Sequence, residues 1–109
     1  MSTFANQVVV VTGGGGGIGG ATCRYFAQHG AKVAVFDLNL KAAQDVAKDI
    51  QAHGGHAAAF ECDITQRNMV DAAVQGATAQ LGPIDVLVNN AGWDVFKPFT
   101  KTSPDDWSR

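Results

Sequence analysis

The feature that most constrains this chain is a run of four valines that leads directly into a cluster of glycines, because residues 8–20 read VVVVTGGGGGIGG. The β-branched valines predict a buried strand. The glycines allow positive φ angles and a tight turn at which the backbone can approach a ligand closely. The helix expected after the turn would direct its free N–H groups at that ligand, an arrangement that binds phosphate groups.

A second apolar run, residues 32–37, ends in the acid Asp37, eighteen residues after Gly19. Strand, glycine turn, helix, strand and terminal acid, in this order, are typical of a dinucleotide-binding unit. Two overlapping sets of glycines match the motif, one beginning at Gly14 and one at Gly15, so the motif alone does not set the register. A flexible glycine linker is the alternative, but linkers do not join a valine-rich strand to an amphipathic helix.

The composition is that of an ordinary globular protein. The chain has 109 residues, of which 46% are hydrophobic and 17% charged, which bounds it to at most one domain and argues against disorder. A formal net charge of −2 with scattered basic residues gives no reason to expect nucleic acid or a membrane as partner. The first residues lack a basic leader region and no apolar run approaches the ~18 residues of a membrane span. We therefore expect a cytoplasmic protein.

The cysteines and histidines show no spacing typical of metal ligands. Cys23 and Cys62 lie far apart, so buried reduced thiols are expected, as suits a reducing cytosol. His29, His53 and His56 are expected at the surface or at helix ends. The sequence thus predicts no metal site.

Hydrophobic periodicity predicts a regular alternation of strands and helices. The expected strands are residues 7–12, 32–37, 57–62 and 84–89, and the expected helices begin near Ile18, Leu40, Thr65 and Ser103. In the first helix the apolar face is predicted to comprise Ile18, Ala21, Thr22, Tyr25 and Phe26, with Arg24 and Gln28 outside it. In the second, the inward residues are predicted to be Ala43, Val46, Ala47 and Ile50; in the third, Val70, Ala73, Val74, Ala77 and Leu81. Thr65 is predicted to cap the third helix.

Strands separated by helices of this length imply an α/β fold with a doubly wound parallel sheet and helices on both faces. The strand expected at 84–89 would be a bare apolar edge unless a further strand covered it. The last expected helix has barely begun at Arg109. Residues 1–109 are therefore expected to be the N-terminal part of a single domain.

Three motifs, in order and at matching separations, resemble the short-chain dehydrogenase/reductase family. The first motif, Thr12-Gly13-x-x-x-Gly17-Ile18-Gly19, resembles the family's cofactor loop. The second, Asp63-Ile64-Thr65, resembles its acidic turn after the third strand, and the third, Asn89-Asn90-Ala91-Gly92, resembles its NNAG motif after the fourth strand. The resemblance covers the whole chain but only the first half of a typical family member. It implies a Rossmann fold, a nicotinamide cofactor, a secondary alcohol or ketone as substrate, and a homo-oligomer, expected to be a tetramer.

The resemblance also implies which residues would bind the cofactor: Gly13, Gly15, Gly16, Gly17, Ile18, Gly19, Asp37, Leu38, Asp63, Ile64, Asn90, Ala91 and Gly92. In the family the acid at the position of Asp63 serves the adenine, the residues at Asn90 and Ala91 approach the ribose, and the one at Asn89 holds the central strand. The alternatives are a solvated turn acid for Asp37, an acid near a helix start for Asp63, and a hydrogen-bonded turn for the asparagines. Gly14 fills a position at which relatives often carry a side chain, so a small substitution is expected to be tolerated there.

Asp37 favours NAD over NADP. Its carboxylate suits two ribose hydroxyls and would repel a 2′-phosphate. The two positions at which a basic residue could neutralise such a phosphate are occupied by Gly16 and Leu38, and neither is an arginine or a lysine.

No catalytic group is expected within these residues. The family uses a serine, a Tyr-x-x-x-Lys pair and an asparagine on the helix that would begin at Ser103. The single tyrosine here is Tyr25, and the residue four positions later is His29. The catalytic segment is therefore expected beyond Arg109.

Two stretches, residues 13–40 and 89–102, most resemble family members that act on alicyclic hydroxyacyl-CoA thioesters. This resemblance implies an acyl-CoA thioester substrate, with Trp93, Phe96 and Phe99 at its mouth, although simple packing of these rings under the next helix is the alternative. A 3-oxoacyl thioester reductase and a non-catalytic dinucleotide-binding module are the other functions considered.

Overall fold

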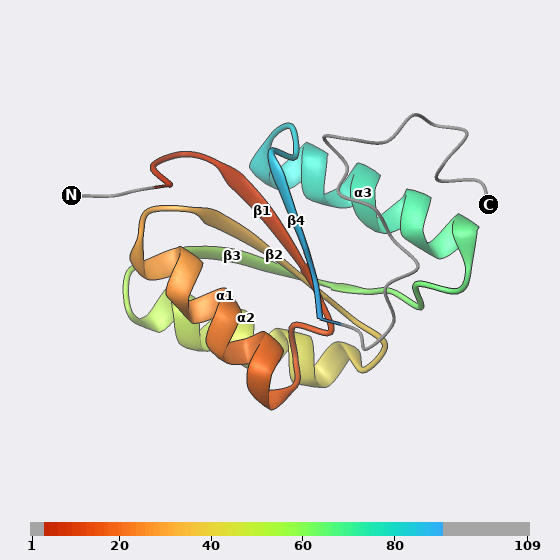
Figure 1. Ribbon diagram of the computed structural model, residues 1–109, viewed down its shortest axis with the longest axis horizontal. Helices are drawn as coiled ribbons and strands as arrows, with labels where there is room; N and C mark the ends of the chain where they lie inside the picture. The colour runs from red at the N-terminus through yellow and green to blue at the C-terminus, as the bar shows by residue number, and fades with distance from the viewer. Residues whose placement is uncertain (1–3, 91–109) are drawn as a thin grey trace.

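The computed structural model describes residues 4–90, which form strands and helices in strict alternation (Figure 1). In chain order the elements are β1 (Val8–Thr12), α1 (Gly17–Gln28), β2 (Lys32–Asp37), α2 (Leu40–Ala52), β3 (His56–Glu61), α3 (Arg67–Leu81) and β4 (Val86–Asn89). The helix expected at Ser103 lies outside the described residues. None of the described helices is long and apolar enough to cross a membrane.

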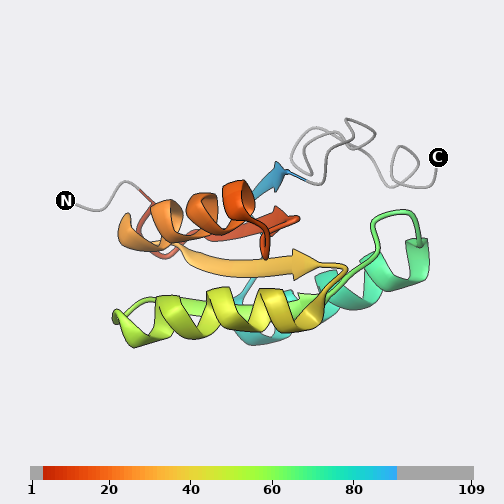
Figure 2. The ribbon, with the colours of Figure 1, turned by 90° about the horizontal axis from the view of Figure 1, so that it is seen from below.

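The strands form one parallel sheet in the order β3-β2-β1-β4, and their arrows run in the same direction in Figure 2. Helices α1 and α2 lie on one face and α3 on the other (Figure 1). The chain adds β2 and β3 on one side of β1 and then returns to add β4 on the other side. The order of the strands therefore reverses between β1 and β4, and open α/β sheets bind ligands at the carboxyl ends of the strands that flank such a reversal. The predicted Rossmann fold is confirmed.

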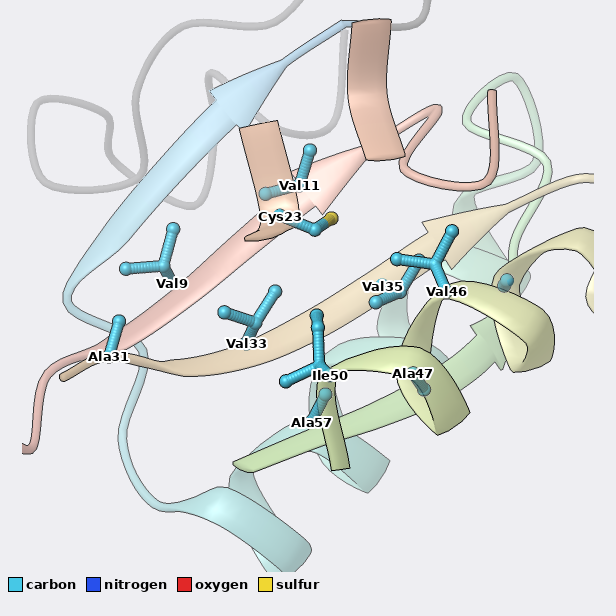
Figure 3. Close-up of a cluster of buried hydrophobic side chains, with 11 residues drawn as sticks. Val9, Val11, Cys23, Ala31, Val33, Val35, Val46, Ala47, Ile50 and Ala57 are labelled. Atoms are coloured by element: carbon cyan, nitrogen blue, oxygen red, sulfur yellow. The ribbon is translucent and has the colours of Figure 1, made fainter. Parts of the chain in front are cut away.

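Alternating side chains of the central strands supply two cores. Val9 and Val11 of β1 face α1 and α2, together with Val33 and Val35 of β2 (Figure 3). Val10 faces α3 on the opposite side. Because both faces of β1 and β2 are covered, these strands are apolar at nearly every position, as expected of a parallel sheet.

Helix α2 follows its predicted pattern. The four residues predicted to point inward, Ala43, Val46, Ala47 and Ile50, are all buried. The side chain of Asn39 accepts a hydrogen bond from the N–H of Ala42 and so caps the helix at its start. Gly54, with a φ of 86°, follows the helix end in the left-handed conformation.

Helix α1 does not follow its predicted pattern. Most of the face predicted to pack is turned outward, so that Ile18 is 80% exposed and Tyr25 53% exposed, whereas Phe26 packs against the core as predicted. The helix instead rests on the sheet through Gly19, Gly20 and Cys23, all of which are buried. The prediction was wrong because glycines add nothing to a hydrophobic pattern, although they permit the closest approach of helix to strand.

Helix α3 buries the predicted residues Val70, Ala73 and Ala77, but its start differs from the prediction. The helix begins at Arg67 after Gln66, which makes no side-chain capping bond. The hydroxyl of Thr65, predicted to be the cap, donates to Asp63 Oδ1 at 2.6 Å. Thr65 therefore closes a turn before the helix: its N–H and its hydroxyl both donate to Asp63 Oδ1, and the helix starts one residue too late for Thr65 to be its cap.

Candidate dinucleotide-binding site

The glycine loop connects β1 to α1 at the carboxyl edge of the sheet. Gly13 has a φ of 66°, so the expected positive φ is found at this position of the loop. The N–H of Gly14 donates to the carbonyl oxygen of Phe36 at 3.0 Å, which attaches the loop to β2. Helix α1 then begins at Gly17 with Gly16 as its cap, and no side chain caps the exposed N–H groups of its first turn. These free donors, at the positive end of the helix dipole, suit a pyrophosphate.

The space around the glycines differs strongly from one position of the motif to the next. A Cβ on Gly19 would overlap the carbonyl oxygen of Gly13, so the crossing of loop and helix requires glycine there. A Cβ on Gly15 would lie 2.8 Å from Cβ of Ala42 in the first turn of α2. Around Gly17, by contrast, nothing lies within 4 Å, so its lack of a side chain leaves the approach to the helix start open. This distribution agrees with the register Thr12-Gly13-x-x-x-Gly17-Ile18-Gly19.

The expectation that Gly14 tolerates a side chain is wrong for this chain. Gly14 is buried, and a Cβ there would lie 2.8 Å from Cγ1 of Val35 and 3.0 Å from both Sγ of Cys23 and the carbonyl oxygen of Val11. This contact could not be predicted from the sequence, because it depends on the distance between α1 and β2 in the folded chain. Gly16, whose nearest such neighbour is 3.7 Å away, is the loop position with room for a side chain.

Asp37 ends β2 beside the glycine loop, as predicted. Its Oδ2 accepts the N–H of Gly15 at 2.9 Å, and its Oδ1 accepts the N–H of Asn39 at 2.8 Å. Each carboxylate oxygen has a further lone pair for a ligand hydroxyl. The contribution of Asn39 was missed from the sequence, although an asparagine directly before a helix is a recognisable capping signal.

The charges around Asp37 agree with the sequence interpretation. Leu38, the next residue, is 65% exposed and carries no charge. The next cation along the chain, Lys41, forms an ion pair with Asp45 at 3.5 Å on α2. A ligand phosphate at Asp37 would therefore meet a carboxylate with no basic side chain from these positions to balance it.

The end of β4 is joined to the end of β1 by side chains. The hydroxyl of Thr12 donates to Asn89 Oδ1 at 2.8 Å and accepts the N–H of Asn90 at 3.1 Å. Thr12 therefore links the end of β1 to the end of the neighbouring strand β4. This geometry agrees with a strand-holding role for Asn89.

Asn90, directly after β4, has an unused side-chain donor. Its side-chain Nδ2 is buried and makes no hydrogen bond, the one such side-chain atom found within residues 4–90. A buried donor without a partner is costly unless a ligand satisfies it. The neighbouring predicted site residues, Ala91 and Gly92, lie outside the described residues.

Asp63 and Ile64 follow β3 at the same edge of the sheet. The Asp63 carboxylate accepts the N–H and the hydroxyl of Thr65, and these bonds hold its pKa below the ordinary value. Ile64 packs against the core on the α3 side. Both residues follow β3 at the carboxyl end of the sheet, and their contact with the adenine stays a prediction.

Both cysteines are buried, and two of the histidines lie at helix ends. Burial raises the pKa of Cys23 to about 12 and that of Cys62 to about 11, so both thiols are protonated and inert. The predicted burial of both is confirmed. His29 and His53 directly follow α1 and α2, and each Nδ1 lies within 2.8 Å of a carbonyl oxygen in the last turn of its helix. Within residues 4–90, no three side chains form a cluster that could hold a metal ion.

Comparison with known proteins identifies the family. The model of the short chain dehydrogenase family matches residues 7–109, and the chain therefore belongs to this family. An uncharacterized oxidoreductase of Bacillus subtilis is 44% identical over 96% of this chain and 16% of its own length. A 3-oxoacyl-[acyl-carrier-protein] reductase of Chlamydia muridarum is 37% identical over 98% of this chain and 44% of its own length. The chain spans less than half the length of these curated relatives.

Solved structures support the same assignment. A 7α-hydroxysteroid dehydrogenase complexed with NADH and 7-oxo glycochenodeoxycholic acid superposes with a TM-score of 0.80 and 40% identity, over 97% of this chain and 41% of that one. A structure from Haemophilus influenza, described as a putative D-mannonate oxidoreductase with bound NAD, superposes with a TM-score of 0.76 and 28% identity, over 79% of this chain and 31% of that one. The family binds nicotinamide dinucleotides, and the glycine loop, the Asp37 carboxylate and the unpartnered Asn90 amide fit such a ligand.

Proposed function

We propose that this chain is the cofactor-binding part of an NAD-dependent oxidoreductase that interconverts a secondary alcohol and a ketone. The observation that carries the proposal is Asp37, a carboxylate held beside the glycine loop and without a basic neighbour at Gly16 or Leu38. Such an acid suits the two free hydroxyls of an NAD ribose and repels the 2′-phosphate of NADP.

Each part of the site has a distinct task in this proposal. The N–H groups at the start of α1 would bind the pyrophosphate, and Asp37 would accept hydrogen bonds from the adenosine ribose. The Asn90 amide would donate to the other ribose. When bound, NAD supplies a hydride acceptor for the substrate carbon. The residues described here contribute binding and orientation to that chemistry.

The proton transfer must come from another part of the protein. Tyr25, the single tyrosine, lies on the outer face of α1, and its ring is 4.3 Å from that of His29 at the end of the helix remote from the glycine loop. We therefore propose that residues 1–109 are the N-terminal part of a single domain, followed by a segment with the serine and Tyr-x-x-x-Lys. Extending the coding sequence beyond codon 109 tests this directly. Absence of that pair from the longer protein would favour a non-catalytic dinucleotide-binding module.

Cofactor preference is the decisive experiment. We expect the full-length protein to favour NAD over NADP by at least about tenfold in kcat/KM, or about 1.4 kcal/mol. Asp37→Ala should narrow the difference, because repulsion of the 2′-phosphate is removed. Asp71→Ala, which removes an exposed acid on α3 and leaves the Lys41–Asp45 pair intact, is the matched control and should leave the preference unchanged. Equal or better use of NADP by the unmodified protein would contradict the proposal.

For the substrate we propose a hydroxyacyl-CoA thioester, with 2-hydroxycyclohexanecarboxyl-CoA as the first candidate. This candidate rests on the resemblance inferred from the sequence of residues 13–40 and 89–102, while the carrier-protein reductase and the 7α-hydroxysteroid dehydrogenase found by comparison act on other substrates. Trp93, Phe96 and Phe99, the aromatic residues expected at the substrate mouth, lie outside the described residues. Oxidation of this thioester with NAD, followed by absorbance at the NADH band, is the test.

A 3-oxoacyl thioester reductase is the second candidate, favoured by the carrier-protein reductase that matches 98% of this chain. It predicts faster reduction of 3-oxoacyl thioesters than oxidation of the cyclic substrate, together with NADPH use. We also propose a cytoplasmic location, supported by the free buried thiols Cys23 and Cys62, and a homo-oligomer, expected as a tetramer. Size-exclusion chromatography with light scattering on the full-length protein tests the assembly.

A further inference from the structure

The carboxylate of Asp37 makes a contact that ribose recognition does not require. Its Oδ2 accepts the N–H of Gly15 at 2.9 Å, across 22 positions of sequence. The preceding residue, Phe36, accepts the N–H of Gly14 through its carbonyl oxygen at 3.0 Å. Two successive amides of the glycine loop are thus attached to two successive residues at the end of β2.

The loop has little else to hold its shape. Residues 13–17 are all glycine and carry no side chains that could pack. Glycine loses more conformational freedom on folding than any other residue, so an all-glycine loop is the costliest to order. Within the loop itself, the N–H of Gly16 reaches the carbonyl oxygen of Gly13 at a long 3.3 Å. The bond to the Asp37 carboxylate is charge-assisted and therefore the stronger kind of contact.

We propose that Asp37 is a positioning residue for the glycine loop as well as the acid that accepts hydrogen bonds from the ribose hydroxyls. By holding the Gly15 amide, its carboxylate fixes the direction of the free N–H groups that begin α1. This inference rests on the proposed function and deepens it, because one side chain then organises the ribose and the phosphate subsites together. It follows that removing the acceptor weakens the binding of both NAD and NADP.

The test compares Asp37→Ala with Asp37→Asn. The amide of asparagine has no charge and only one acceptor oxygen, which can take the part-buried Gly15 N–H when the exposed Asn39 N–H turns to solvent, whereas alanine has no acceptor. Glycine-selective 15N labelling and hydrogen exchange, in the absence of cofactor, report the Gly15 amide directly. We expect exchange at Gly15 to be about tenfold faster in Asp37→Ala than in the unmodified chain, and within about threefold in Asp37→Asn. Asp45→Ala is the matched control for loss of an acid and should not change this rate.

The affinities of the same variants for NAD and NADP complete the experiment. By calorimetric titration, Asp37→Ala should bind both dinucleotides less tightly than Asp37→Asn does. Unchanged protection of Gly15 in Asp37→Ala, or equal loss in the alanine and asparagine variants, would overturn the positioning role while leaving NAD preference intact. Conversely, if the unmodified protein binds no NAD but the exchange pattern is as expected, the positioning role stands and the proposed function fails. Equal unfolding midpoints of the variants verify that the effect is local.

Discussion

Helices α1 and α2 are neighbours on one face of the sheet, yet they contact it in opposite ways. Helix α2 packs through branched and small apolar side chains, among them Val46 and Ile50, and its sequence pattern predicts this face. Helix α1 packs through Gly19, Gly20 and Cys23, while Ile18 points to solvent. The difference shows that a helix that presents its N-terminus to a ligand is placed by close backbone approach, and a helix that only covers the core is placed by side-chain volume.

The sharpest test of this contrast is Gly19→Ala in α1. The added methyl group would overlap the Gly13 carbonyl oxygen, and backbone cannot move aside as a flexible side chain can. We expect a loss of at least about 3 kcal/mol in the free energy of unfolding, together with loss of NAD binding. Urea denaturation and calorimetric titration measure the two effects.

Gly17→Ala, at the open start of the same helix, is the control for Gly19→Ala. Since nothing lies within 4 Å of the added carbon, stability should stay equal or rise by up to about 1 kcal/mol, because alanine is the better helix former. A harmless Gly19→Ala would mean that α1 does not approach the loop as closely as described.

One isoleucine in each helix can be truncated to compare how much side-chain packing contributes to the stability of α1 and of α2. Ile50 of α2 is 4% exposed, so Ile50→Ala should cost about 3 kcal/mol by leaving a cavity. Ile18 of α1 is 80% exposed, so Ile18→Ala should change the stability of this chain by no more than about 0.5 kcal/mol. Thermal unfolding of both variants is sufficient. Similar losses for the two would restore the original prediction that the Ile18 face of α1 is a packing face.

Within the glycine loop, Gly14→Ala should be the harmful change and Gly16→Ala the mild one. The Cβ at residue 14 would press on Val35 and Cys23, whose side chains can give way in part, so we expect a loss of about 2 kcal/mol. At residue 16 the nearest such neighbour is 3.7 Å away, and a change below about 0.5 kcal/mol is expected. The two midpoints of urea unfolding decide between this order and the reverse.

The smallest expected effect concerns the ion pair that links the two helices. Arg24 of α1 donates to Asp49 of α2 at 2.6 Å, and this bond lowers the pKa of the Asp49 carboxyl from its ordinary 3.8. A lowered pKa in the folded state gives stability that is present above the ordinary value and is lost as the pH falls through the folded one. Both side chains are about 40% exposed, so solvent screens the pair and the effect is small.

Arg24→Gln should therefore narrow the fall in melting temperature between about pH 6 and about pH 3, since Asp49 would titrate nearer its unfolded value. Lys41→Gln, which breaks the more exposed pair with Asp45, is the matched control. An equal acid-induced fall in the unmodified protein and in Arg24→Gln would show that the pair does not couple the helices.

Much of this architecture is encoded locally and could be predicted without coordinates. The strands around Val10 and Val35, the inward face of α2 and the position of Asp37 after β2 all depend on periodicity and on residue order along the chain. The start of α3 could not be predicted, because Thr65 has two possible partners nearby and its hydroxyl bonds to Asp63 instead of capping the helix.

The sequence by itself determined the Rossmann alternation, the glycine loop and the position of the acid Asp37 after the second strand, because each of these is carried by residue type and spacing. Tertiary structure alone decided three other features. It placed the Thr12 hydroxyl on Asn89, joined Asp37 to the Gly15 amide and closed the space around Gly14. These contacts join residues that are distant in the chain but only a few ångströms apart in space. Such distances depend on how closely helix, loop and strand pack once the chain has folded.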